Sequence, residues 1–163
     1  MAHPSRELVS ALRDTARRLQ KDAPFHWGHM GRCNCGHLAH TVTGATPAEI
    51  HAAALERHGD WAGQALEYCP TSGLEIDALV GRLLDLGLTG RDLAQLERLN
   101  DPLVLRRIPA DRLPLQRSRR DDAVLYMHTW ADALAERVPV LPPAPSGQVS
   151  ATIKVPLHAG SEQ

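Results

Sequence analysis

The sequence predicts an all-α fold, a small helical bundle of about six to seven helices, on three observations. Apolar residues recur at spacings of three and four along most of the chain, which is the period of an amphipathic helix. Aromatic residues make up only 4% of the 163 residues while hydrophobic residues reach 43%. The core must therefore be built from Leu, Val, Ile and Ala. The length suits one domain that buries a core without a disulfide.

The first predicted helix covers residues 5–21. Its apolar side chains recur on one face, and Arg and Asp residues occupy the opposite face. Asp22, Ala23 and Pro24 end it, because proline cannot continue a helix. The apolar face consists of Leu8, Leu12, Ala16 and Leu19.

Three later helices are marked by capping signals at their first residues. In each, a Ser or Thr that can accept a hydrogen bond from the helix backbone is followed three positions later by an acidic residue. The first signal also has Pro47 at the first helical position, and that helix is expected to end at Gly59. The pairs are Thr46 with Glu49, Ser72 with Glu75, and Thr89 with Asp92.

The remaining helices follow from apolar spacing and from prolines. We expect short helices within 60–68 and 101–108, and a long last helix with apolar residues from 124 to 138. Four prolines between 139 and 145 end that helix. Residues 1–138 are thus expected to form a single helical domain. Residues 139–163 are expected to form a flexible Pro-rich tail, in which 150–155 could pair as an edge strand.

Charge and cysteine content narrow the class of protein. The formal net charge of -1 and the pI near 6.7 argue against a nucleic-acid binder that works by bulk electrostatics. An odd number of cysteines without an apolar leader segment indicates a reduced, cytoplasmic protein. No window has the apolar length that a membrane span needs, so no membrane association is expected.

The segment 25–45 interrupts the helical pattern and is expected to be an irregular loop with one helical turn near Leu38. It has four glycines, and residues 26–40 hold six of the twelve His and Cys residues of the chain. Simple proportion would place about one of them in a window of that length. We therefore take this segment as the candidate functional centre. Its six residues are His26, His29, Cys33, Cys35, His37 and His40.

These residue types predict a metal site, because zinc and iron prefer thiolate and imidazole ligands. In extended geometry Cys33, Cys35 and His37 project to the same side of the chain. If the segment is helical instead, His37 and His40 share a face. We predict these four as ligands of zinc or iron, with the distant Cys69 as a possible addition, and a three-cysteine set would also suit an iron–sulfur cluster.

The surplus of ligands keeps a catalytic or redox-active centre open. His26, His29 and Glu56 are predicted as outer or alternative ligands, since more than four candidates exceed a closed zinc site. A second alternative is a cysteine-dependent enzyme. In it, Cys33 or Cys35 is the nucleophile, activated beside Gly36 at a helix N-terminus. The base would be His37, His40 or His128.

Residues 87–108 give another alternative. Leu88, Thr89, Leu93, Ala94, Leu99 and Val104 occupy N-cap and core positions of a helix-turn-helix, and Arg106 falls on the second helix. The segment resembles the helix-turn-helix of phage-repressor-like regulators. That resemblance implies a metal-stabilised or metal-sensing regulator that binds DNA through the second helix.

A run of arginines follows the same segment. It could hold phosphates or an acidic partner. Asp121 and Asp122 come directly after it and can pair with it, so a solvated surface is the commoner meaning of such a run. The run comprises Arg106, Arg107, Arg112, Arg117, Arg119 and Arg120.

Overall fold

The computed structural model describes residues 2–57, 59–66 and 75–139, and the predicted all-α class is confirmed. Eight α-helices, one short 3-10 helix and no strand lie within these ranges. None of the helices described is both long and apolar enough to cross a lipid bilayer. Ser72, the tail from residue 140 onward and the strand predicted at 150–155 lie outside the described ranges.

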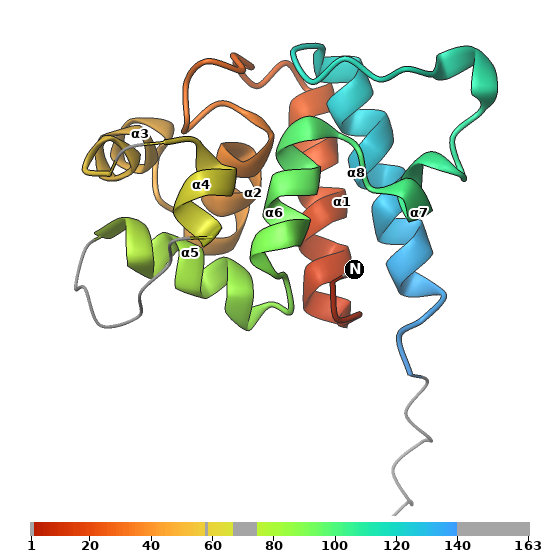
Figure 1. Ribbon diagram of the computed structural model, residues 1–163, viewed down its shortest axis with the longest axis horizontal. Coiled ribbons are helices and arrows are strands. Elements are labelled where there is room, and N and C mark those ends of the chain that lie inside the picture. The colour runs from red at the N-terminus through yellow and green to blue at the C-terminus, as the bar shows by residue number, and fades with distance from the viewer. Residues whose placement is uncertain (1, 58, 67–74, 140–163) are drawn as a thin grey trace, which may run out of the picture.

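Helices α1 (Arg6–Gln20) and α8 (Arg120–Ala135) pack side by side and form the most extensive helix pair of the fold (Figure 1). The hydroxyl of Ser5 begins α1 by accepting a hydrogen bond from the Leu8 amide, 3.0 Å away. The apolar face predicted for the first helix is fully buried, which confirms that assignment.

Five helices form the rest of the core. Helix α2 (Asn34–Thr43) contacts α1, α3 (Pro47–Leu55), α5 (Glu75–Asp85) and α6 (Gly90–Arg98), so it is the central element. Helix α4 (Trp61–Leu66) packs on α6. Figure 1 shows α3, α4 and α5 gathered on one side of α1, and α7 and α8 on the other.

Helix α7 (Pro102–Leu105) and the 3-10 helix Ala110–Arg112 connect this part to α8. Asp101 caps α7, as expected for a helix that begins at Asp101–Pro102. The buried hydroxyl of Tyr126 on α8 accepts a hydrogen bond from the Asp101 amide at 3.1 Å. This bond fixes the start of α7 against α8.

Two capping predictions are confirmed in full. Thr46 and Glu49 exchange hydrogen bonds with each other's backbone at the start of α3. Thr89 and Asp92 do the same at the start of α6. Both helices therefore begin where the sequence places them.

The expectation of an irregular loop across 25–45 is wrong for its second half, where α2 forms. Glycine lowers helix propensity, and this hid the helix in the sequence. Gly36 lies inside α2 because a loop passes against it: an added Cβ would be 2.0 Å from the Met30 carbonyl oxygen. A Cβ added to Gly31 would likewise lie 1.9 Å from the carbonyl oxygen of Pro47. These two glycines allow close approach of backbones.

We expect Gly36→Ala to lower the free energy of unfolding by about 3 kcal/mol, because its methyl group would overlap the backbone of Met30 and Gly31. Gly63→Ala in α4 is the matched control, since its nearest neighbour is a side-chain oxygen of Asp60 at 3.6 Å. That variant should match the wild type or gain up to about 1 kcal/mol. Urea unfolding followed by circular dichroism measures both. Equal effects in the two variants would contradict the packing assigned to Gly36.

Candidate functional site

The backbone of Met30 holds the loop of residues 26–33 against three helices. Its amide donates to Nδ1 of His51 on α3 at 3.2 Å. Its carbonyl oxygen accepts from the indole Nε1 of Trp61 on α4 at 3.0 Å and from the thiol of Cys33 at 3.3 Å. The Cys33 side chain is therefore held by the same residue that positions the loop.

Cys33 is the N-cap of α2 and is only 2% exposed. Burial raises the pKa of its thiol to about 12, and the carboxylate of Glu97 acts in the same direction. The amides of Gly36 and Cys35 and the indole of Trp61 act in the opposite direction. Burial outweighs these effects, so Cys33 is a protonated thiol near pH 7.

Cys35 lies in the first turn of α2 and is completely buried. Its thiol donates to the carbonyl of Leu93 on α6 at 3.3 Å. Burial raises its pKa well above the ordinary value, and Cys33 and Glu97 add to the rise. The Glu97 carboxylate therefore raises the pKa of both thiols.

Glu97 is the acidic group of this pocket and is 4% exposed. Burial raises its pKa to about 6, and the carboxylate of Asp60 adds to the effect. The amide of Ala62 donates to one carboxylate oxygen at 3.1 Å. Sequence analysis missed this residue, because a single Glu in a helix normally faces solvent.

The expectation that Cys33, Cys35 and His37 project to one side in extended geometry is wrong, since residues 34–43 are helical. Helical geometry separates positions 35 and 37 by about 200° around the axis. His37 instead points to other partners. Its Nε2 donates to the carbonyl of Pro24 at 3.1 Å, and Arg18 donates to the His37 carbonyl at 2.7 Å.

Both ring nitrogens of His37 are engaged, because Arg18 also lies 3.4 Å from Nδ1. Burial lowers the pKa of His37 to about 4, and the Arg18 guanidinium contributes. The ring is therefore neutral near pH 7. Its geometry suits a structural link between α2, α1 and the chain at Pro24.

His40 is the imidazole of α2 with an open nitrogen. Its Nδ1 donates to the carbonyl of Ala45 at 2.6 Å, which leaves Nε2 as the acceptor. Such a bond orients many metal-ligating histidines. However, seven positions along a helix correspond to about 10 Å, so His40 lies too far along α2 to share one ion with Cys33.

His29 and His51 stack with their ring centroids 3.9 Å apart. Nδ1 of His29 accepts from the Gly31 amide at 3.2 Å, just as Nδ1 of His51 accepts from Met30. Burial lowers the pKa of His29, and His51 and Arg32 contribute. Sequence analysis missed the pair of His29 and His51, because the two residues are far apart in the chain and no sequence pattern connects them.

The predicted ligands do not come together as one set within the described ranges. No group of three or more His, Cys, Asp or Glu residues there could hold a metal ion. Exposed Glu56 ends α3, and His26 is exposed on the loop. Cys69 lies outside the described residues, so its predicted role stays a prediction.

The segment 87–108 forms α6 and a very short second helix. Helix α7 has four residues and buries Val104, so it is about 6 Å long. Arg106 is its C-cap. A helix of this length presents few side chains to a DNA groove. DNA binding, which the resemblance to helix-turn-helix regulators implies, stays a prediction.

Several arginines of the basic run have specific partners. Arg107 forms a two-pronged pair with Glu136 at 2.7 Å, and the guanidinium of Arg117 lies 3.9 Å from the ring centroid of Trp27. These contacts agree with the interpretation of the run as a paired, solvated surface. Two further pairs join Arg112 to Asp122 and Arg120 to Asp22.

Comparison with protein-family models, curated proteins and solved structures finds no match to this chain. The functional argument therefore depends on a cluster of buried side chains, Cys33, Cys35, Trp61 and Glu97, which we call the thiol pocket.

We expect the thiols of Cys33 and Cys35 to react with iodoacetamide at pH 8 at least about a hundredfold more slowly in the folded chain than in the unfolded chain. Burial excludes the reagent and holds the thiols protonated. Peptide mass spectrometry after timed quenching measures each thiol separately from Cys69. Rapid native labelling at either position would contradict the assigned burial.

The low pKa of His37 predicts a pH-dependent stability. Between pH 6.5 and about 4, the unfolded chain binds a proton at this residue that the folded chain does not. The contribution of neutral His37 is thus fully present above pH 6.5 and is lost as pH falls through 4. His37→Gln should be less stable than the wild type at pH 7, and the gap should shrink toward pH 4.

Urea unfolding of both proteins across this range measures the gap. Glu97 acts with the opposite sign, because its raised pKa favours the folded state more at low pH. Since both proteins contain Glu97, its effect cancels in the difference. A gap that stays constant from pH 7 to pH 4 would rule out the role assigned to His37.

Proposed function

We propose that this protein binds a thiophilic metal ion, zinc or iron, through Cys33 and Cys35. The observation that carries the proposal is the environment of the Cys33 sulfur. The amides of Gly36 and Cys35, in the first turn of α2, lower the pKa of this thiol, and amides at this position favour a thiolate over a thiol. The Glu97 carboxylate lies close enough to raise the pKa of Cys33, and both Cys33 and Glu97 raise the pKa of Cys35.

Charge balance explains why a cation suits this pocket. With Cys33, Cys35 and Glu97 ionised together, three negative charges would lie in a buried region, which is unfavourable without a cation. A metal ion takes the place of the two thiol protons, and affinity should rise with pH because those protons are released. Soft thiolate ligands favour zinc, iron–sulfur centres and copper(I) over calcium or magnesium.

The histidines contribute differently in this proposal. His37 keeps its bonds to Pro24 and Arg18 and supports the helix that presents the cysteines. His40 lies two turns further along α2 and is not a ligand of the same ion. The ligand set in the described residues thus narrows from the four predicted positions to two thiols.

We expect the full-length protein, purified without oxygen or chelators, to contain about one metal ion per chain by analogy with known thiolate sites. Cys33→Ser and Cys35→Ser should each reduce this content at least tenfold. His40→Ala is the matched control and should retain it. Elemental analysis for zinc, iron and copper gives the content, and circular dichroism checks that each variant is folded.

Cobalt(II) provides a second readout that does not depend on metal acquired during expression. A sulfur-to-cobalt charge-transfer band in the wild type that weakens in both serine variants would support thiolate ligation. Metal-free wild-type protein that also shows no such band would overturn the proposal. Unchanged metal content in both serine variants would overturn it as well.

A second candidate is thiol catalysis by Cys33, favoured by its place at the N-terminus of α2. The alkylation rates described above separate the two candidates. Nucleophilic catalysis requires a thiolate that a small reagent can reach in the folded protein, whereas the metal site requires only that the ion reach it.

A further inference from the structure

A groove of about 480 Å³ opens between α1 and the end of α8, away from the thiol pocket. Arg6, Ser10, Arg13 and Arg17 line it from α1. Their spacing of four, three and four places them along one helix face. Three guanidinium groups therefore follow the length of a single groove.

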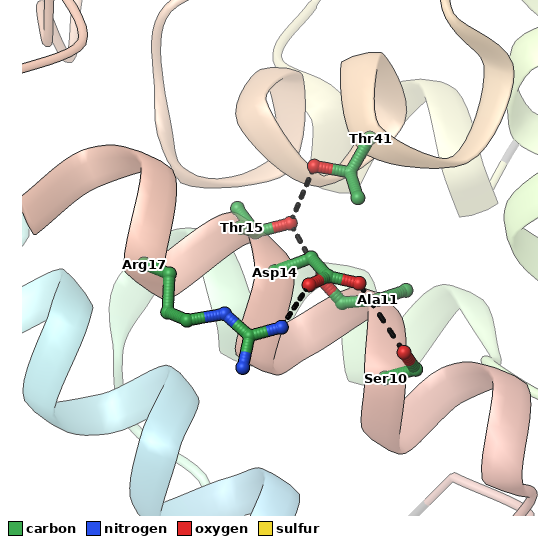
Figure 2. Close-up of polar contacts among 6 residues, drawn as sticks. All are labelled: Ser10, Ala11, Asp14, Thr15, Arg17 and Thr41. Atoms are coloured by element: carbon green, nitrogen blue, oxygen red, sulfur yellow. Dashed lines mark hydrogen bonds and ion pairs between the residues drawn. The ribbon is translucent and has the colours of Figure 1, made fainter. Parts of the chain in front are cut away.

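Carboxylates hold two of these guanidinium groups in place. Arg17 donates to Asp14, and the hydroxyl of Ser10 donates to the other oxygen of that carboxylate at 3.2 Å (Figure 2). Arg13 donates to Asp132 of α8 at 2.8 Å. Exposed pairs of this kind add little stability, but they orient a guanidinium whose other N–H groups stay available.

Arg6 has no ion-pair partner among the residues that the structure describes. Three arginines against the carboxylates of Asp14 and Asp132 leave one positive charge in excess along the groove. The groove is thus complementary to a single anionic head group.

The opposite wall of the groove is apolar. Ala135, Val138 and Pro139 provide it from the end of α8, and Val9 adds to it from α1. A volume of about 480 Å³ falls within the range of small-molecule sites, which commonly combine apolar walls with a few placed polar groups. The apolar wall and the arginines of α1 are together complementary to a molecule that has an apolar body and one negatively charged end.

We propose that this groove binds a small anionic amphiphile, a molecule with one carboxylate-like head and an apolar body. The head contacts the guanidinium groups of Arg6 and Arg13, and the body lies on Val9 and Val138. This site is separate from the thiol pocket and holds or fails independently of metal binding.

The test uses the full chain and 8-anilinonaphthalene-1-sulfonate, an anionic aromatic probe whose fluorescence rises on apolar surfaces. Dodecanoate and dodecanol then compete with it at low ionic strength. We expect dodecanoate to displace the probe at a concentration at least tenfold lower than dodecanol, because only dodecanoate has a charged head.

Variants locate the site. Arg6→Gln and Arg13→Gln should each weaken dodecanoate binding by about tenfold, the loss of one charge-assisted contact. Arg106→Gln removes an exposed arginine at the end of α7, outside the groove, and should leave binding unchanged. Circular dichroism confirms that all three variants are folded.

Equal displacement by dodecanoate and dodecanol would overturn the proposal, because the arginines would then play no part. An equal loss in Arg106→Gln and in the groove variants would also overturn it, since it would indicate nonspecific attraction. Retained metal content in Arg6→Gln and Arg13→Gln would show that any loss of binding is local to the groove.

Discussion

One residue, Met30, joins the loop of residues 26–33 to three helices through its backbone N–H and C=O groups. Its amide bonds to His51 of α3, and its carbonyl accepts from Trp61 of α4 and from Cys33 at the start of α2. The same carbonyl passes so close to Gly36 that no side chain fits there. A shift of the Met30 backbone would release contacts to three helices at once, so the loop and Cys33 depend on the same residue.

The anchored pocket joins acidic groups that are all easier to protonate than in water. The pKa values of Cys33, Cys35 and Glu97 are all raised, mainly by burial. Each group also raises the pKa of a neighbour, since like charges repel in a medium of low polarity. Binding of the proposed cation would therefore be coupled to the release of protons from these groups.

Sequence periodicity predicted the fold class well, because capping and apolar spacing are local signals. The boxes at Thr46 and Thr89 and the face of α1 depend only on neighbours in the chain. Helix α2 was predicted only as one turn near Leu38, since Gly36 disfavours a helix locally and is required there only by tertiary contact with Met30.

The candidate site shows the same division between local and distant signals. The sequence indicated Cys33 and Cys35 through enrichment of Cys and His, which is a local count. It could not indicate Glu97 or Trp61, whose place beside the thiols depends on how α6 and α4 pack. Likewise, His51 meets His29 only because α3 folds back over the loop.

The pairing of α1 with α8 has a consequence for how the chain is made. Synthesis proceeds from the N-terminus, so α1 leaves the ribosome first, while α8 is the last described helix to emerge. Until then, the face of α1 that α8 covers has no partner, and a nascent chain with an exposed apolar helix is prone to bind other chains. Completion of this bundle is therefore delayed until α8 has emerged, and before then α2 covers only the part of α1 that it contacts.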